Sequence, residues 1–181
     1  NHSLSQTYQV APGDVVNPVH QDLEEAAQFM PVHFLLNVIV NHRREIIDAV
    51  AGHIKEAYLA GVEKSKKRFL VPVSKLYDVV IASTGGFPKD IQLYQAVKTL
   101  QNAAKITKPG GSIVLLARCQ EMFGNGIFQY WVDTIQDQTA IAQMLQQEFV
   151  LGAHKIDHIH KVLQQHQVYL YSDLPESTVE S

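Results

Sequence analysis

Apolar and polar positions along the first third of the chain predict four elements separated by loops. Residues 10–18 contain two prolines, a Gly-Asp pair and an Asn-Pro pair, which is the composition of a loop. A short helix is expected after Asp22 as its N-cap, and the apolar, β-branched segment 32–40 predicts a buried strand. A second strand is expected at 45–50, followed by an amphipathic helix at 53–69.

A strand, a glycine-rich loop, a helix and another strand follow in the second part of the chain. The continuous apolar run 77–83 predicts a strand, residues 84–89 a loop, and 91–106 a helix. A KPGG turn then leads into a second buried strand at 112–119. Because a strand, a crossover helix and a second strand form a right-handed unit, this order predicts a parallel sheet.

The remaining pattern completes an α/β fold. Three further helices, a last strand and a polar, frayed tail are expected at 127–134, 139–149, 154–166, 168–172 and 173–181.

The segment VPVS at 71–74 marks a change in composition, and its proline cannot continue the preceding helix. We therefore place a domain boundary after residue 72. Residues 1–72 are expected to form an α/β unit of their own. Residues 73–181 are expected to form a Rossmann-like βαβ domain with a parallel sheet.

Composition narrows the functional classes. Hydrophobic residues make up 46% of the 181 residues and charged residues 18%, which excludes intrinsic disorder for most of the chain. A formal net charge of −3 gives no basic surface for nucleic acid or anionic membranes. The apolar runs are far shorter than the roughly 20 residues that cross a bilayer. A single cysteine, Cys119, excludes an internal disulfide and fits the cytoplasm; we expect it to be a buried core residue.

The loop TGGFPKD is the first candidate site. It follows a strand and precedes a helix, which is where open α/β sheets bind ligands. Gly85 and Gly86 would let a backbone approach a ligand closely, and a helix beginning near Asp90 would favour an anion at its N-terminus. A simple tight turn explains the same residues, since no complete phosphate-binding motif is present.

A second candidate lies on the following helix. Tyr94 and Lys98 are four residues apart, with Gln95 beside them, so a phenol, an amide and an ammonium could converge on a small carboxylate. An ordinary solvated helix face remains the alternative. His154 and His158 have the i, i+4 spacing of metal ligands, but an isolated HxxxH pattern is weak, and a structural role is favoured.

Several segments spread over nearly the whole chain form a recognisable set. The most specific is the pattern GGxPxDxxLYQAxK, which runs from Gly85 to Lys98. The others are Asn1-His2, NPVHQDLEEAA (17–27), FLLNVIVN (34–41), AGHIKEAYLAGVE (51–63), KPGG (108–111), LGAHK (151–155) and VYLYSDLP (168–175). Together they resemble the nickel-pincer lactate racemase (LarA-type) family and its 2-hydroxyacid racemase and epimerase relatives.

The resemblance implies an enzyme that inverts C2 of a small 2-hydroxy acid by moving a hydride to and from a cofactor. The implied cofactor is the nickel pincer nucleotide, a pyridinium-3-thioamide-5-thiocarboxylic acid mononucleotide that holds nickel. Carried over by motif, His2 resembles the nickel ligand. Tyr94, Gln95 and Lys98 resemble the residues that reach the cofactor and the substrate carboxylate. His154 stands where lactate racemases place a tryptophan, which implies a larger or more polar hydroxy acid than lactate.

The resemblance also implies what this chain does not contain. The family's cofactor-tethering lysine, its two acid–base histidines and its phosphate-binding loop would precede Asn1, so no catalytic residue is expected here. By the same resemblance, residues 1–72 would be the end of a cofactor-binding N-terminal α/β domain, and residues 73–181 the C-terminal α/β domain of lactate racemase type. Because the chain begins without methionine, we expect it to belong to a longer polypeptide whose N-terminal part is its partner. The isolated chain is expected neither to retain the nickel cofactor nor to racemise a substrate.

Two other functions fit the same pattern. A methyltransferase-like Rossmann domain shares the βαβ unit and the KPGG segment, although its glycine-rich cofactor loop is missing. A non-catalytic α/β module for binding small molecules or other proteins would use the same residues only for packing.

Overall fold

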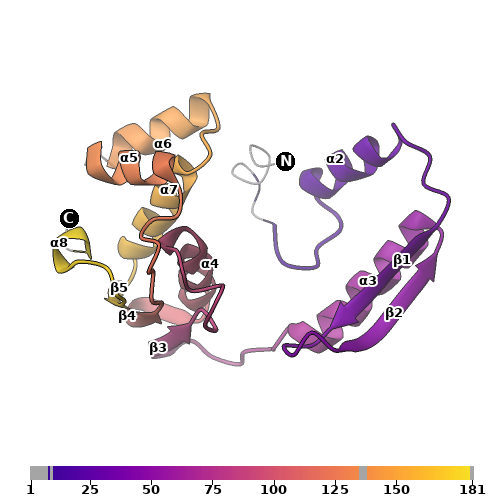
Figure 1. The fold of residues 1–181 in the computed structure, drawn as a ribbon, viewed down its shortest axis with the longest axis horizontal. Coiled ribbons are helices and arrows are strands. Elements are labelled where there is room, and N and C mark those ends of the chain that lie inside the picture. The colour runs from indigo at the N-terminus through magenta and orange to yellow at the C-terminus, as the bar shows by residue number, and fades with distance from the viewer. Residues whose placement is uncertain (1–7, 9, 135–137, 180–181) are drawn as a thin grey trace. The chain divides into compact units, whose positions relative to one another are not determined.

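The computed structural model describes residue 8 and residues 10–134 and 138–179. The chain divides into two compact units, Asn1–Pro72 and Val73–Ser181, which are described separately below (Figure 1). Among the described residues, none of the helices is long and apolar enough to cross a membrane.

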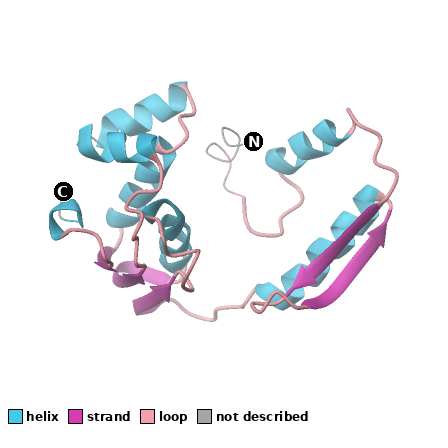
Figure 2. Cartoon of the chain, viewed as in Figure 1, coloured by secondary structure: helices cyan, strands magenta, loops and turns pink. Residues whose placement is uncertain are grey.

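The first unit is a two-stranded sheet with a long helix along it. Strands β1 and β2 are antiparallel, and α3 packs on both strands (Figure 2). Gly61 of α3 lies so close to the sheet that an added Cβ would be 3.2 Å from the Val50 side chain. The elements in chain order are α2 (Pro18–Ala27), β1 (Leu35–Val40), β2 (Ile46–Gly52) and α3 (Ile54–Phe69).

Two expected boundaries in this unit are wrong. The first helix does not begin after Asp22 but at Pro18, because the Asn17 side chain accepts a hydrogen bond from the His20 backbone N–H and acts as the N-cap. The expected strand at 32–40 begins only at Leu35, where its antiparallel pairing with Gly52 begins.

The second unit is α/β, as expected, with the parallel sheet order β3-β4-β5. Strand β3 and helix α4 occupy the expected segments, and their connection to β4 is the predicted crossover. The elements are β3 (Tyr77–Ser83), α4 (Leu93–Ala104), β4 (Thr107–Leu116), α5 (Gly126–Thr134), α6 (Gln138–Gln147), α7 (Ala153–Leu163), β5 (Gln167–Tyr171) and α8 (Glu176–Val179).

Two segments of this unit differ from expectation. The KPGG segment is not a turn before the strand, since β4 already begins at Thr107. The register to β3 shifts between the Tyr77–Thr107 and Val79–Ser112 pairs, so an irregularity takes up the extra residues. The tail is not entirely frayed, because α8 forms a single helical turn.

One face of the parallel sheet is the core of the second unit. Val80, Ile113 and Leu115 point to this face and are buried against Ala96 and Leu100 of α4. Alternation along the strands brings every second residue to this side. Cys119 also belongs to this core, where burial raises the pKa of its thiol to about 11, so the expected structural role is confirmed.

The opposite face of the sheet is apolar but uncovered in the described second unit. Ile81, Val114 and Tyr169 are paired across the three strands, and Leu116 pairs with Tyr171 beside them. Ile81 and both tyrosines are exposed. Parallel sheets are normally covered on both faces, so this face differs from the usual arrangement.

An isoleucine-to-alanine substitution should lower the stability of the second unit strongly on the buried face of the sheet and only slightly on the exposed face. Ile113→Ala removes a fully buried side chain and should destabilise the second unit by about 2–5 kcal/mol. Ile81→Ala, in the neighbouring strand but 70% exposed, should change stability by less than about 0.5 kcal/mol. Urea unfolding of both variants measures the difference; equal losses would contradict the assignment of the core face.

Candidate functional site

Helix α4 places the three predicted residues outside its buried stripe. Ala96, Leu100 and other small or apolar residues face the core, whereas Tyr94 and Gln95 are half-buried and Lys98 is exposed. The Lys98 Nζ donates a hydrogen bond of 2.8 Å to Gln95 Oε1. The ammonium and the amide are therefore held together on one side of the helix, as the sequence spacing predicts.

The first backbone N–H groups of α4 are hydrogen-bonded within the chain. The backbone N–H of Leu93 donates to the Met122 carbonyl at 2.9 Å, and that of Tyr94 donates to the Phe123 carbonyl at 3.2 Å. These two helix-end donors are already satisfied by the chain itself.

Gly85 and Gly86 lie in the loop between β3 and α4. Both have positive φ, 88° and 78°, and an added Cβ would meet no atom within 4 Å at either position. The loop therefore needs glycine for its conformation rather than for space. Their role in binding a ligand stays a prediction.

Helix α7 brings His154 close to the Tyr94 ring of α4. Its N-cap, Gly152, has φ of 100°, and an added Cβ would lie 2.7 Å from Asn125 Oδ1 and 2.9 Å from the Phe128 backbone nitrogen. Glycine is thus required where α7 meets the start of α5. The first turn of α7 is buried as a consequence, and His154 is only 6% exposed.

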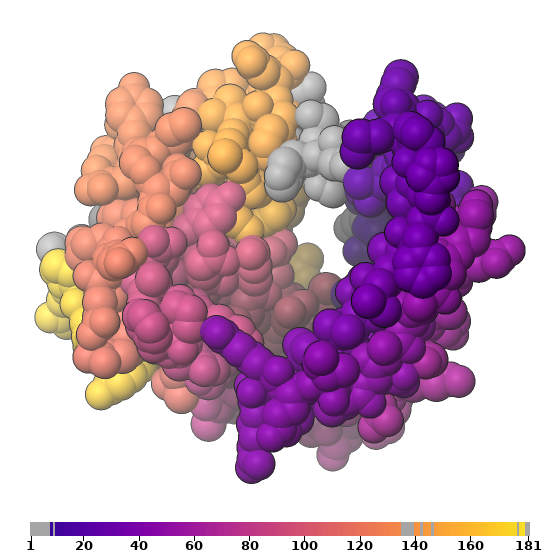
Figure 3. Space-filling model, turned by 45° about the vertical axis from the view of Figure 1, so that its right-hand side comes forward, coloured from indigo at the N-terminus to yellow at the C-terminus, as the bar shows by residue number. Residues whose placement is uncertain are grey.

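Tyr94 and His154 belong to one cluster of rings. The ring centroid of Tyr94 lies 6.1 Å from that of His154 and 6.2 Å from that of Phe128, and both ring pairs are edge-to-face. The ring centroid of His154 also lies 5.2 Å from that of Phe149 and 5.5 Å from that of His158. Figure 3 shows the rose-coloured residues of α4 beside the orange ones of α5–α7, and α4 contacts α7 directly.

Lys155 is the residue of this cluster that sequence reasoning missed. Its side chain is 5% exposed, and Nζ lies 5.1 Å from the centroid of the Tyr94 ring. Burial, together with the charge of Lys98, lowers the pKa of Lys155 to about 8. The only sequence signal is a lysine directly after a Gly-Ala-His start of an apolar helix.

The ring centroids of the two α7 histidines, His154 and His158, lie 5.5 Å apart, and among the described residues no third potential metal ligand completes a group with them. Burial, the charge of Lys155 and His154 lower the pKa of His158 to about 4, so its ring is neutral at pH 7. His154 Nδ1 accepts a hydrogen bond from the Gly152 N–H, and that nitrogen is not available to a metal. No group of three potential metal ligands occurs among the described residues. The predicted nickel ligand, His2, lies outside them.

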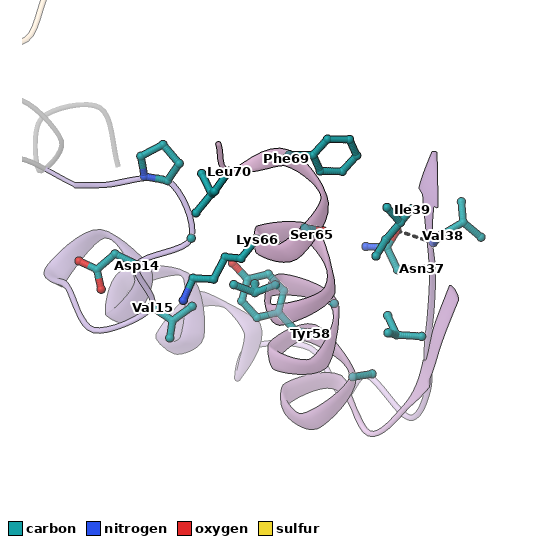
Figure 4. Close-up of a pocket in the computed structure, with 16 residues that line it drawn as sticks. Asp14, Val15, Asn37, Val38, Ile39, Tyr58, Ser65, Lys66, Phe69 and Leu70 are labelled. Atoms are coloured by element: carbon teal, nitrogen blue, oxygen red, sulfur yellow. Dashed lines mark hydrogen bonds between the residues drawn. The ribbon is translucent and has the colours of Figure 1, made fainter. Parts of the chain in front are cut away.

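The first unit contains a cavity of about 360 Å³ between its N-terminal loop, α3 and β1 (Figure 4). Apolar side chains such as Ile39 and Tyr58 line it, together with Asp14 and Lys66. None of the predicted site residues that the structure describes contributes to this lining. The ring and lysine cluster on α4 and α7 is therefore the stronger candidate site.

Comparison with known proteins identifies the family. Residues 73–181 match the lactate racemase C-terminal domain family. The chain belongs to that family. The match covers the whole second unit, including α4 and α7, so the resemblance seen in the motifs is confirmed.

Two curated relatives are named lactate racemase. The protein of Thermoanaerobacterium thermosaccharolyticum is 36% identical and that of Lactiplantibacillus plantarum 31% identical, each over 121 residues. The aligned part is 67% of this chain and 28% of each relative. The structure of the lactate racemase apoprotein from T. thermosaccharolyticum matches with a TM-score of 0.81 and 29% identity, over 91% of this chain and 40% of that one.

The electrostatics of the cluster predict that the charge of Lys98 affects the pKa of Lys155. Because the charge of Lys98 lowers the pKa of Lys155, Lys98→Met should raise that pKa above 8. It should stay below 10.5, since burial is the larger cause. NMR titration of the lysine side chains measures the shift. Lys161→Met, on the same helix but exposed, is the control and should leave the Lys155 pKa unchanged.

Proposed function

We propose that this chain is the C-terminal part of a 2-hydroxyacid racemase or epimerase and supplies its carboxylate-binding side. Tyr94, Gln95 and Lys98 would hold the substrate carboxylate, with His154 beside it and Gly85 and Gly86 at the nearby loop. Residues 1–72 would be the end of the N-terminal domain that precedes this one.

The observation that supports the proposal is that two lysines of the cluster, Lys98 and Lys155, have no acidic partner among the described residues. Lys98 is bonded to a neutral amide and Lys155 lies on an aromatic ring, and within the described part of the chain neither forms a salt bridge. An ammonium and an amide held 2.8 Å apart form a preorganised receptor for a carboxylate. Such a receptor fixes the orientation of a small acid, which is what transfer at the neighbouring carbon requires.

The implied cofactor would contact this site with its anionic groups and not with its metal. The described cluster offers ammonium donors but no set of three metal ligands. We therefore propose that Lys98 and Tyr94 contact the substrate or the nickel pincer nucleotide, and that His2 and residues outside this chain hold the metal. The chemistry supplied by that cofactor would be reversible acceptance of the C2 hydride.

The chain spans 28% of the length of its curated relatives. We propose that the rest of the active site lies in the remaining length. Proton transfer at the substrate hydroxyl would come from residues outside this chain. The partner of the chain would thus be the rest of the same polypeptide, and its ligand a small 2-hydroxy acid.

Substitution of Lys98 in the longer polypeptide tests this function. Lys98→Met removes a charge-assisted contact to the carboxylate, so kcat/KM for racemisation should fall roughly 10- to 100-fold. Lys105→Met, at the other end of α4, is the matched control and should keep full activity, since Lys105 is exposed and its ammonium donates a hydrogen bond to Asn102.

Chiral chromatography of the product measures both rates. A Lys98→Met enzyme as active as the parent would contradict the proposed role, and would favour the reading of the domain as a module without catalytic contacts.

A further inference from the structure

Three features of Lys155 oppose its burial as an ammonium. The residue is only 5% exposed, it lies near the positive charge of Lys98, and it occupies the first turn of α7, where the helix dipole disfavours a cation. The contact with the Tyr94 ring offsets only part of this cost.

The effect on folding has a definite sign. The pKa of Lys155 is lowered from 10.5 to about 8 in the folded protein, so the unfolded chain binds the proton more tightly. Protonation of Lys155 therefore opposes folding below pH 8, and this penalty disappears as the pH rises towards 10.5. A bound anion would remove the penalty at neutral pH.

Among the residues that the structure describes, the surroundings of Lys155 supply no such anion. Tyr94 and Lys98 face it from α4, and His154 and His158 flank it on α7. The nearest acid on its own helix, Asp157, is paired with Lys161 at 2.6 Å. His158 Nδ1 is buried without a hydrogen-bond partner among the described residues. Within the described part of the chain, Lys98 and Lys155 are thus two lysines without an acidic partner at the packing of α4 against α7.

We propose that Lys155 is a specificity-determining residue that binds a second carboxylate, so that the site prefers a hydroxy dicarboxylate over a hydroxy monocarboxylate. This inference rests on the proposed function for the first carboxylate, which Lys98 and Gln95 hold. Lys155, from a different helix, then reads the far end of the substrate. A monocarboxylate leaves Lys155 unpaired, whereas a dicarboxylate pairs both ammoniums.

Binding to the 181-residue chain tests the preference without any catalysis. Amide NMR spectra are recorded during titration with malate and with lactate at pH 7 and constant ionic strength. The Kd for malate should be about tenfold lower than for lactate, with shifts on both α4 and α7. Equal affinities, or no saturable shift with malate, would overturn the inference.

Two substitutions of Lys155 distinguish a role in ligand binding from a role in packing alone. Lys155→Met should bring the malate affinity to within about twofold of the lactate affinity, whereas Lys155→Arg should retain the preference. Lys161→Met, on the same helix but exposed, is the control and should behave as the wild type. A malate preference that survives in Lys155→Met would overturn the role of this lysine.

The two proposals fail in different ways. A longer polypeptide that racemises no hydroxy acid, while the chain still prefers malate through Lys155, would refute only the proposed function. A longer polypeptide that racemises lactate and malate equally, with no preference in the binding titration, would refute only the inference about Lys155.

Discussion

The contact between α4 and α7 is the constraint on which the candidate site depends. Gly152 lets α7 begin against α5, and the buried first turn then places His154 and Lys155 beside Tyr94. The sheet β3-β4-β5 supports this arrangement from one side through the core residues of α4. Loss of the close approach at Gly152 would move the ring and lysine cluster as a whole.

The site combines an apolar support with two lysines that form no salt bridge among the described residues. A structural lysine is normally exposed or paired, because burying a lone ammonium is unfavourable. Lys155 is neither exposed nor paired within the described chain. Stability is thus given up at a position where a ligand could restore it, which is a frequent feature of functional sites.

The sequence was sufficient for the fold of the second unit and for part of the site. Apolar runs predicted β3 and α4, and helical spacing placed Gln95 and Lys98 together, because both depend on local periodicity. The capping of α4 by the carbonyls of Met122 and Phe123 was not predictable, nor was the burial of Lys155. Both depend on how distant segments pack, which local patterns do not encode.

The central claim is that this chain is one part of a nickel-dependent hydroxyacid racemase, and nickel content with intact mass tests it most directly. The longer polypeptide, produced together with the enzymes that make the cofactor, should carry nickel and the added mass of the cofactor. The 181-residue chain, treated in the same way, should carry neither. Absence of both from the longer polypeptide, under conditions that load a known lactate racemase, would contradict the account.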